Sequence, residues 1–143
     1  MDAIYILPLV IIGFVFLCFI MAKTFSATFL PDKYSELKQK YPYPLHNYSW
    51  LSGNFKFGLL SFRMRPLKIE VYEKMIIISA IGQGLCLPYN KFIFEQKQIL
   101  FSHVLVVKTL PESSEYQEKS KTILEIAFLS EDKINTILSL VHK

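Results

Sequence analysis

A continuous apolar segment dominates the beginning of the chain. The 19 residues from Ile4 to Ala22 include no charged side chain. A helix rises about 1.5 Å per residue, so this segment would be roughly 28 Å long, close to the ~30 Å hydrocarbon core of a bilayer. The pattern predicts one transmembrane helix, with residues 1–25 as a membrane anchor and residues 4–22 in contact with the lipid bilayer.

Two other interpretations of this segment remain open, a cleaved signal peptide and a buried helix of a soluble domain. A signal peptide has a basic beginning, a shorter apolar run and a cleavage site of small residues. Here Asp2 precedes the apolar run without any Lys or Arg, and residues 25–27 (Phe-Ser-Ala) are a poor cleavage site. These features favour a permanent anchor.

After residue 50 the pattern changes to the short alternating segments of a β-sheet. Apolar and polar residues alternate from Leu67 to Tyr72, which predicts a strand with one buried face. Glu73 and Lys74 form a predicted turn before Met75 to Ser79, whose β-branched residues favour a buried strand. The segment from Gly82 to Gly84 marks a second turn. Further strands are predicted within residues 55–62, 85–89, 92–110 and 122–129, with Leu124, Ile126 and Phe128 on one face of the last strand.

The last part of the sequence predicts an amphipathic helix. Ser130 is a suitable N-cap, and the carboxylates of Glu131 and Asp132 favour a helix N-terminus. Apolar residues then recur at helical spacing and form one stripe, made of Ile134, Ile137, Leu138 and Val141. We expect this stripe to cover the preceding sheet.

Residues 26–50 are predicted to connect the anchor to the sheet. Their first part predicts a short helix at residues 31–40, with Pro31 in its first turn. Glu36 and Lys40 have the i,i+4 spacing of a helical ion pair.

Residues 41–50 are rich in proline and aromatic residues and predict an extended linker. Its tyrosines and Trp50 suit either the edge of the domain core, which we favour, or the membrane interface. A second polar segment, residues 111–121, predicts an exposed hairpin tip or a partly disordered loop.

Six or seven short antiparallel strands followed by one helix restrict the possible folds. Strands of this length cannot bury a face by themselves. Rolling them into two near-orthogonal sheets and closing the open end with the helix solves that problem. We therefore predict a mainly β domain at residues 51–143, a β-roll capped by the C-terminal helix.

Three features in this domain follow a recognisable order. A strand begins at Trp50, a hairpin turn precedes Met75, and residues Leu85 to Tyr89 read Leu-Cys-Leu-Pro-Tyr. This order resembles the pleckstrin-homology-like (PH-like) and GRAM-like superfamily, especially small bacterial membrane-anchored proteins with such a domain. Lys74 stands where those relatives usually have a glycine.

The resemblance covers residues 48–142 and implies a binding scaffold rather than an enzyme. Domains of this superfamily bind lipid headgroups, peptides or other proteins. Their headgroup-binding loop corresponds to the region near Arg63, Arg65 and Lys68, which lacks the full lysine-x-basic signature. No headgroup site is therefore assigned.

Positive charge is concentrated in the part of the chain next to the anchor. Residues 23–110 contain 12 Lys and Arg against 5 Asp and Glu, whereas residues 111–143 contain 4 against 6. The lysines that follow the apolar segment predict, by the positive-inside rule, a cytoplasmic domain and an external N-terminus. We expect a single-pass protein of the bacterial cell (inner) membrane, and the two isolated cysteines suit a reducing compartment. The basic surface either is solvated or attracts anionic lipid.

The sequence predicts no catalytic, cofactor or metal site. His46, His103 and His142 do not stand at metal-ligand spacing with one another, with Cys or with carboxylates. Cys86 and His103 would be the candidate nucleophile and base of an enzyme, but nothing in their sequence context requires them to meet. The dispersed basic residues do not favour nucleic-acid binding.

Two functions of different classes fit these observations. The first is a membrane-tethered PH-like interaction module that binds another membrane protein or anionic lipid headgroups. The second is an accessory subunit or assembly factor of a larger membrane complex.

Overall fold

The computed structural model describes residues 3–111 and 120–143, excluding the side chains of residues 3, 4 and 25–27. Most of the predicted polar segment 111–121 lies outside the described residues. The helices are α1 (Ala3–Phe29), α2 (Tyr34–Lys40) and α3 (Glu131–Val141). The strands are β1 (Asp32–Lys33), β2 (His46–Phe57), β3 (Leu60–Val71), β4 (Met75–Ala80), β5 (Gln83–Pro88), β6 (Phe92–Ile99), β7 (Ser102–Thr109) and β8 (Thr122–Ala127).

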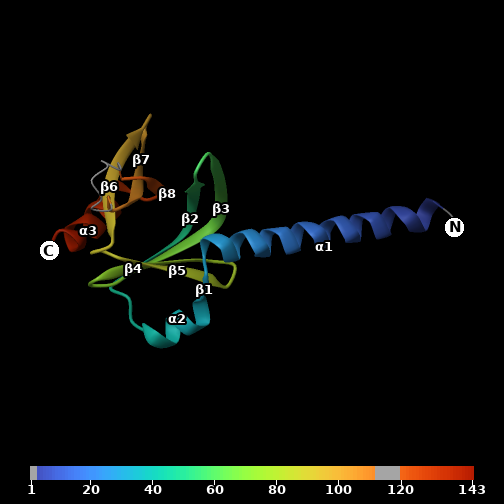
Figure 1. Cartoon of the computed structure of the whole chain (residues 1–143), viewed down its shortest axis with the longest axis horizontal. Coiled ribbons are helices and arrows are strands. Elements are labelled where there is room, and N and C mark those ends of the chain that lie inside the picture. The colour runs from blue at the N-terminus through green and yellow to red at the C-terminus, as the bar shows by residue number, and fades with distance from the viewer. Residues whose placement is uncertain (1–2, 112–119) are drawn as a thin grey trace.

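Helix α1 projects from the rest of the molecule as a long rod (Figure 1). Its segment Tyr5–Thr24 is long and apolar enough to cross a membrane, and its large apolar side chains are exposed to the surroundings. The apolar helix predicted from the sequence is therefore confirmed. It continues past the predicted span and ends at Phe29.

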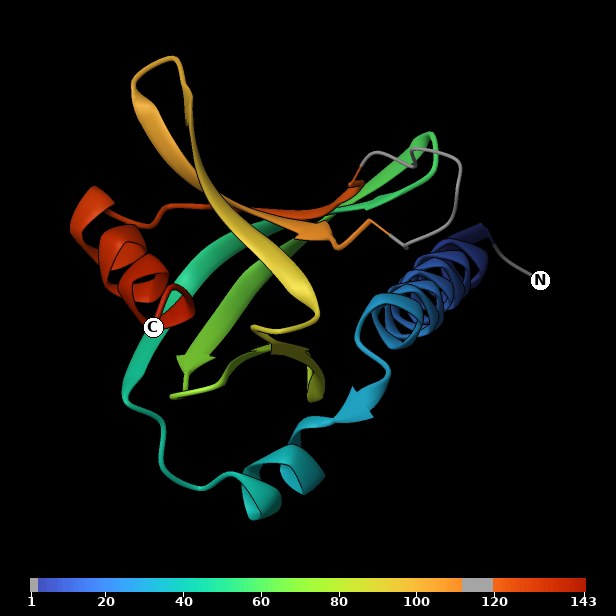
Figure 2. The ribbon, with the colours of Figure 1, turned by 60° about the vertical axis from the view of Figure 1, so that its left-hand side comes forward.

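Within the described residues, the strands form one antiparallel sheet in the order β1-β5-β4-β3-β2-β8-β7-β6. The prediction of two near-orthogonal sheets is wrong in this respect, because the hydrogen bonding continues from one half to the other. Strand β2 pairs with β3 along most of its length and with β8 from Ser52 to Phe55. The sheet curls strongly without closing (Figure 2).

The mainly β domain and its C-terminal helix agree with the prediction. Leu67, Ile69 and Val71 have no exposed surface, so the predicted face of this strand is confirmed. Helix α3 lies against β6 and β7, where it buries Ile134 and Ile137 completely. Leu138 and Val141 pack around this contact, so the predicted stripe covers the sheet.

The short helix before the sheet was predicted in part. Helix α2 begins at Tyr34, so Pro31 lies before it rather than in its first turn. Glu36 forms an ion pair with Lys33, at 3.7 Å and spacing i,i+3, in place of the expected pair with Lys40. Both partners are largely exposed, so this pair contributes little stability.

Strand β2 begins at His46, within the segment predicted as an extended linker. A bulge interrupts its pairing with β3 between Tyr48 and Leu51 and turns Trp50 outward, 82% exposed. The preferred expectation that Trp50 packs on the domain core is therefore wrong.

The last strand also ends earlier than predicted. Strand β8 stops at Ala127, and Phe128 has a left-handed backbone with φ of 69°. That conformation breaks the alternation that buries Leu124 and Ile126, so Phe128 is 64% exposed. The prediction that Phe128 shares their buried face is wrong.

A buried carboxylate connects α2 to the sheet. Glu70 on β3 is 1% exposed, and its Oε1 lies 2.8 Å from Lys38 Nζ and 3.3 Å from Lys68 Nζ. Burial alone would raise the pKa of Glu70, but the hydrogen bond and charge of Lys38, with the charge of Lys68, hold it below its usual value. Helix α2 is thus fixed to the domain by charge as well as by packing.

Candidate interaction surface

A groove crosses the outer face of the sheet between the β2–β3 and β6–β7 hairpins. It has a volume of about 410 Å³ and combines a polar floor with an apolar rim. We call it the arginine groove, and its lining residues are Ser52, Asn54, Arg63, Arg65, Ile99, Leu100, Phe101, Ser102, Val104, Glu125 and Ala127.

The two arginines of the groove differ in how they are held. The Nε–H of Arg65 donates to Ser52 Oγ at 3.0 Å, and the Arg65 guanidinium lies 4.9 Å from the centroid of the Phe128 ring. Arg63 is exposed and has no ion-pair or hydrogen-bond partner among the described residues. One cation is therefore fixed in position, and the second is available to an incoming anion.

Among the described residues, the lining contains one carboxylate, and its charge is already compensated. Glu125 Oε1 accepts a hydrogen bond from Lys56 Nζ at 3.0 Å. Because Lys56 neutralises Glu125, the positive charges of Arg63 and Arg65 are left in excess in the groove. The groove therefore favours an anionic group over a cationic one.

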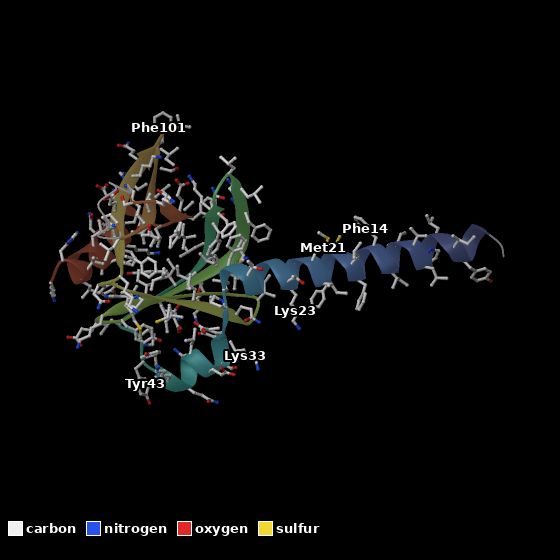
Figure 3. All side chains as sticks on the ribbon, in the orientation of Figure 1. Phe14, Met21, Lys23, Lys33, Tyr43 and Phe101 are labelled. Carbon is white, nitrogen blue, oxygen red and sulfur yellow. The ribbon has the colours of Figure 1, made fainter. Side chains whose placement is uncertain are left out.

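The β6–β7 hairpin supplies the apolar rim. Leu100 and Phe101 are 85% and 99% exposed at its tip, and Ile99 beside them is 40% exposed. Figure 3 shows Phe101 at the far end of this hairpin, pointing away from the body of the sheet. Three consecutive apolar side chains at a hairpin tip are more than the isolated exposed residues of an ordinary surface.

A second apolar patch adjoins the groove through Arg65. We call it the Trp50 patch and define it as Trp50, Pro66, Ile81 and Phe128. Trp50 and Pro66 line one hollow with Ile81 and another with Phe128 and Arg65.

Strained backbone accompanies these exposed residues. Trp50, Ile81 and Phe128 have φ values of 60°, 52° and 69°, and Leu100 at the groove rim has 54°. Large or β-branched residues rarely adopt this left-handed conformation, which costs of order 1–3 kcal/mol each and often accompanies function. The fold thus holds bulky apolar side chains outward at a cost in stability.

The structure separates the three basic residues singled out from the sequence. Arg63 and Arg65 meet in the arginine groove, whereas Lys68 lies elsewhere. Lys68 donates to Tyr34 Oη at 2.9 Å and pairs with Glu70. Burial opposes the charge on Lys68, but the hydrogen bond to Tyr34 and the charge of Glu70 raise its pKa. Lys68 is therefore part of the α2 attachment and not of the groove.

The histidines have separate structural surroundings. His46 stacks on Tyr48 with ring centroids 6.2 Å apart. His103 Nδ1 lies 2.6 Å from Gln96 Nε2, and its Nε2 lies 3.6 Å from Glu131. Within the described ranges, no cluster of His, Cys, Asp and Glu suitable for a metal ion is found.

Cys86 and His103 have different neighbours. Cys86 Sγ lies 3.1 Å from Met75 Sδ on the adjacent strand β4, and none of the contacts of His103 includes Cys86. Burial, followed by the charge of Asp32, raises the pKa of the Cys86 thiol despite the opposing charge of Lys40. At neutral pH the thiol is therefore protonated, which disfavours nucleophilic attack.

The sequence matches no known protein-family model and no curated protein.

The sequence did not predict the apolar residues of this surface, because their pattern is also typical of strands. Ile99 to Phe101 stood inside the predicted 92–110 strands, although the polar positions beside this run mark a hairpin tip. Ile81 directly precedes Gly82, whose φ of 73° completes the β4–β5 turn. Apolar residues at turn positions were the available signal, since turns normally favour Gly, Asn, Asp and Pro.

Proposed function

We propose that this chain is a single-pass membrane protein whose cytoplasmic domain is a PH-like interaction module. Seven consecutive antiparallel strands, β2 to β8, followed by helix α3 support the PH-like assignment. The apolar helix α1 supports the anchor, and the lysines that follow it support a cytoplasmic domain. The resemblance to small bacterial membrane-anchored proteins supports a bacterial inner membrane.

The module binds a protein partner through the arginine groove and the Trp50 patch. The observation that carries this proposal is the exposed cation of Arg63 beside an apolar rim, next to a second cation fixed by Ser52. A carboxylate fits the two guanidinium groups, and apolar side chains fit Leu100, Phe101 and Trp50. The partner is therefore a segment that combines acidic and apolar residues.

Membrane attachment favours a partner in the same membrane. Confining both proteins to one bilayer raises their effective concentration and makes a weak groove contact sufficient. The groove does not need the affinity of a soluble complex, which agrees with its open shape and modest volume of about 410 Å³.

Site-specific crosslinking in native membranes tests this function. A photo-crosslinking residue replaces Leu100 in the full chain, with and without Arg63→Glu. The expected product joins position 100 to an acidic and apolar segment of one membrane protein, and Arg63→Glu removes it. Lys91→Glu, a charge reversal at an exposed lysine outside the groove, is the matched control and leaves the product intact.

Two results would contradict the proposal. One is a crosslink that survives Arg63→Glu as well as it survives Lys91→Glu. The other is crosslinking to many unrelated proteins without a common acidic segment. Native gel migration of the purified complex then separates a transient module from a permanent subunit of a larger assembly.

A further inference from the structure

The β2–β3 hairpin carries a second apolar tip, on the side of the domain where α1 emerges. Phe57, Leu59 and Leu60 are 71%, 106% and 72% exposed around Gly58. In Figure 1 this tip lies nearer to α1 than the β6–β7 tip does, and in Figure 2 the two tips lie on opposite sides of the domain.

The face of this hairpin that carries Phe57 and Leu60 is the face that receives α1. Phe29, at the end of α1, lies 5.4 Å from Phe55 and 5.7 Å from Phe62, measured between ring centroids. Phe55 pairs with Phe62, and Phe57 pairs with Leu60 two positions farther along the hairpin. Side chains two positions apart share one face of a strand, so the docked aromatic pair continues directly into the exposed apolar pair.

The distance from this contact to the lipid is short. Phe29 is five residues beyond Thr24, the end of the membrane-spanning segment, or roughly 7.5 Å along a helix. The headgroup layer on each side of a bilayer is roughly 5–8 Å deep. Phe55 and Phe62 therefore lie near the outer limit of that layer, and Phe57 and Leu60 lie about one strand repeat, roughly 7 Å, away from them.

The attachment leaves little freedom for the domain to move away from the membrane. Leu30, the residue after α1, has no exposed surface, and the α2 segment that follows is fixed by the Lys38–Glu70 contact.

We propose that the β2–β3 tip, residues Phe57 to Leu60, inserts into the interfacial layer of the bilayer that α1 crosses. This inference rests on the proposed membrane span and goes beyond it by naming a second contact with lipid. The contact orients the domain so that the β6–β7 rim of the groove lies farther from the bilayer than the β2–β3 tip, on the side left to the partner.

A fluorescence experiment on the full chain separates this contact from the span itself. An environment-sensitive fluorophore is attached to one cysteine in each of three chains. The first retains Cys18 in α1 and carries Cys86→Ser. The other two lack both native cysteines and carry Leu59→Cys or Phe101→Cys. Each chain is reconstituted into phosphatidylcholine vesicles containing a minor share of phosphatidylglycerol and spin-labelled lipid.

The two tip positions form a matched pair, because Leu59 and Phe101 are both fully exposed apolar residues at hairpin tips. We expect blue-shifted emission and strong quenching by lipid spin labels at positions 18 and 59, with a shallower depth at 59. Position 101 gives the emission of a label in water. Adding Phe57→Ser and Leu60→Ser to the Leu59→Cys chain abolishes quenching at 59. The same two substitutions in the first chain leave quenching at position 18 unchanged.

Each alternative result has a distinct meaning. Quenching at 18 with a water-like signal at 59 overturns the tip contact and leaves the span intact. A water-like signal at 18 overturns the membrane span on which both proposals rest. Equal quenching at 59 and 101 overturns the proposed orientation, and blue-shifted emission at 59 without lipid quenching identifies contact with protein instead.

Discussion

Phe29 of α1 and Phe62 of β3 lie in a parallel, offset stack, with ring centroids 5.7 Å apart and planes inclined by 3°. The contact joins the last residue of the apolar helix to the β2–β3 hairpin, two positions from its tip residue Leu60. It makes the end of α1 part of the domain core, because Leu30 is completely buried beside it.

Replacing Phe29 by Ala removes this stacked ring and its contact with Phe55. Because Phe29 is only partly buried, we expect the free energy of unfolding of the domain to fall by about 1–2 kcal/mol, less than for a fully buried phenylalanine. Denaturant titration in detergent micelles, followed by near-ultraviolet circular dichroism, measures the loss. Phe14→Ala, in the exposed part of α1, is the control and leaves the midpoint unchanged.

Replacing Glu70 by Gln removes the buried charge shared by Lys38 and Lys68. Each lysine side chain is about one-third exposed, at 36% and 33%, so water compensates part of the loss. We expect a decrease of about 1–3 kcal/mol in the free energy of unfolding at neutral pH. Glu73→Gln, in the exposed β3–β4 turn, leaves it unchanged.

The lowered pKa of Glu70 predicts a dependence on acid. Folding favours its ionised form, so the stabilisation is fully present above the unfolded-state pKa, about 4.3. It is lost as the pH falls through the lower folded-state pKa. The unfolding midpoint of the wild type therefore falls more steeply in acid than that of Glu70→Gln, and parallel curves would contradict the assignment.

Tyr72 predicts a loss of stability in base. Burial, followed by the charge of Glu70, raises the pKa of Tyr72 to about 12, and its hydroxyl donates to the Tyr41 carbonyl at 2.8 Å. Its contribution is fully present below the unfolded-state pKa of about 10 and is lost as the pH rises toward the folded value. Phenolate absorbance measures the titration. Tyr72→Phe flattens the alkaline fall in stability, whereas the exposed Tyr43→Phe does not.

Replacing Ile81 by Gly tests whether backbone strain at the Trp50 patch is maintained for binding. Glycine adopts the φ of 52° without a Cβ clash but loses more entropy on folding. The relieved strain exceeds that entropy, so we expect about 1 kcal/mol of added stability. The partner crosslink at position 100 weakens at the same time. A variant that is more stable and still forms the full crosslink would contradict a role for Ile81 in the interface.

The hydrophobic periodicity of the sequence was sufficient to predict the elements that have a regular buried face. The alternation around Leu67, Ile69 and Val71 and the stripe through Ile134 and Ile137 each correspond to a face without exposed surface. Burial of apolar area is the dominant force on such segments, so their pattern and their structure agree.

The same periodicity could not predict which apolar residues are exposed. Trp50 and Phe128 follow the strand pattern, but a bulge and a left-handed residue turn them outward. These are local backbone events that hydrophobic periodicity does not encode. Arg63 and Arg65 were visible as basic residues, but the apolar rim beside them comes from a hairpin more than 30 positions away in the chain.

Helix α1 continues directly into the buried Leu30, so the helix and the sheet move together as one rigid unit. An apolar helix adjusts its tilt to the thickness of the surrounding bilayer. Without a slack hinge at residues 29–30, a change in that tilt swings the sheet through the same angle. In a bilayer, lipid composition would thereby set the direction in which the arginine groove points.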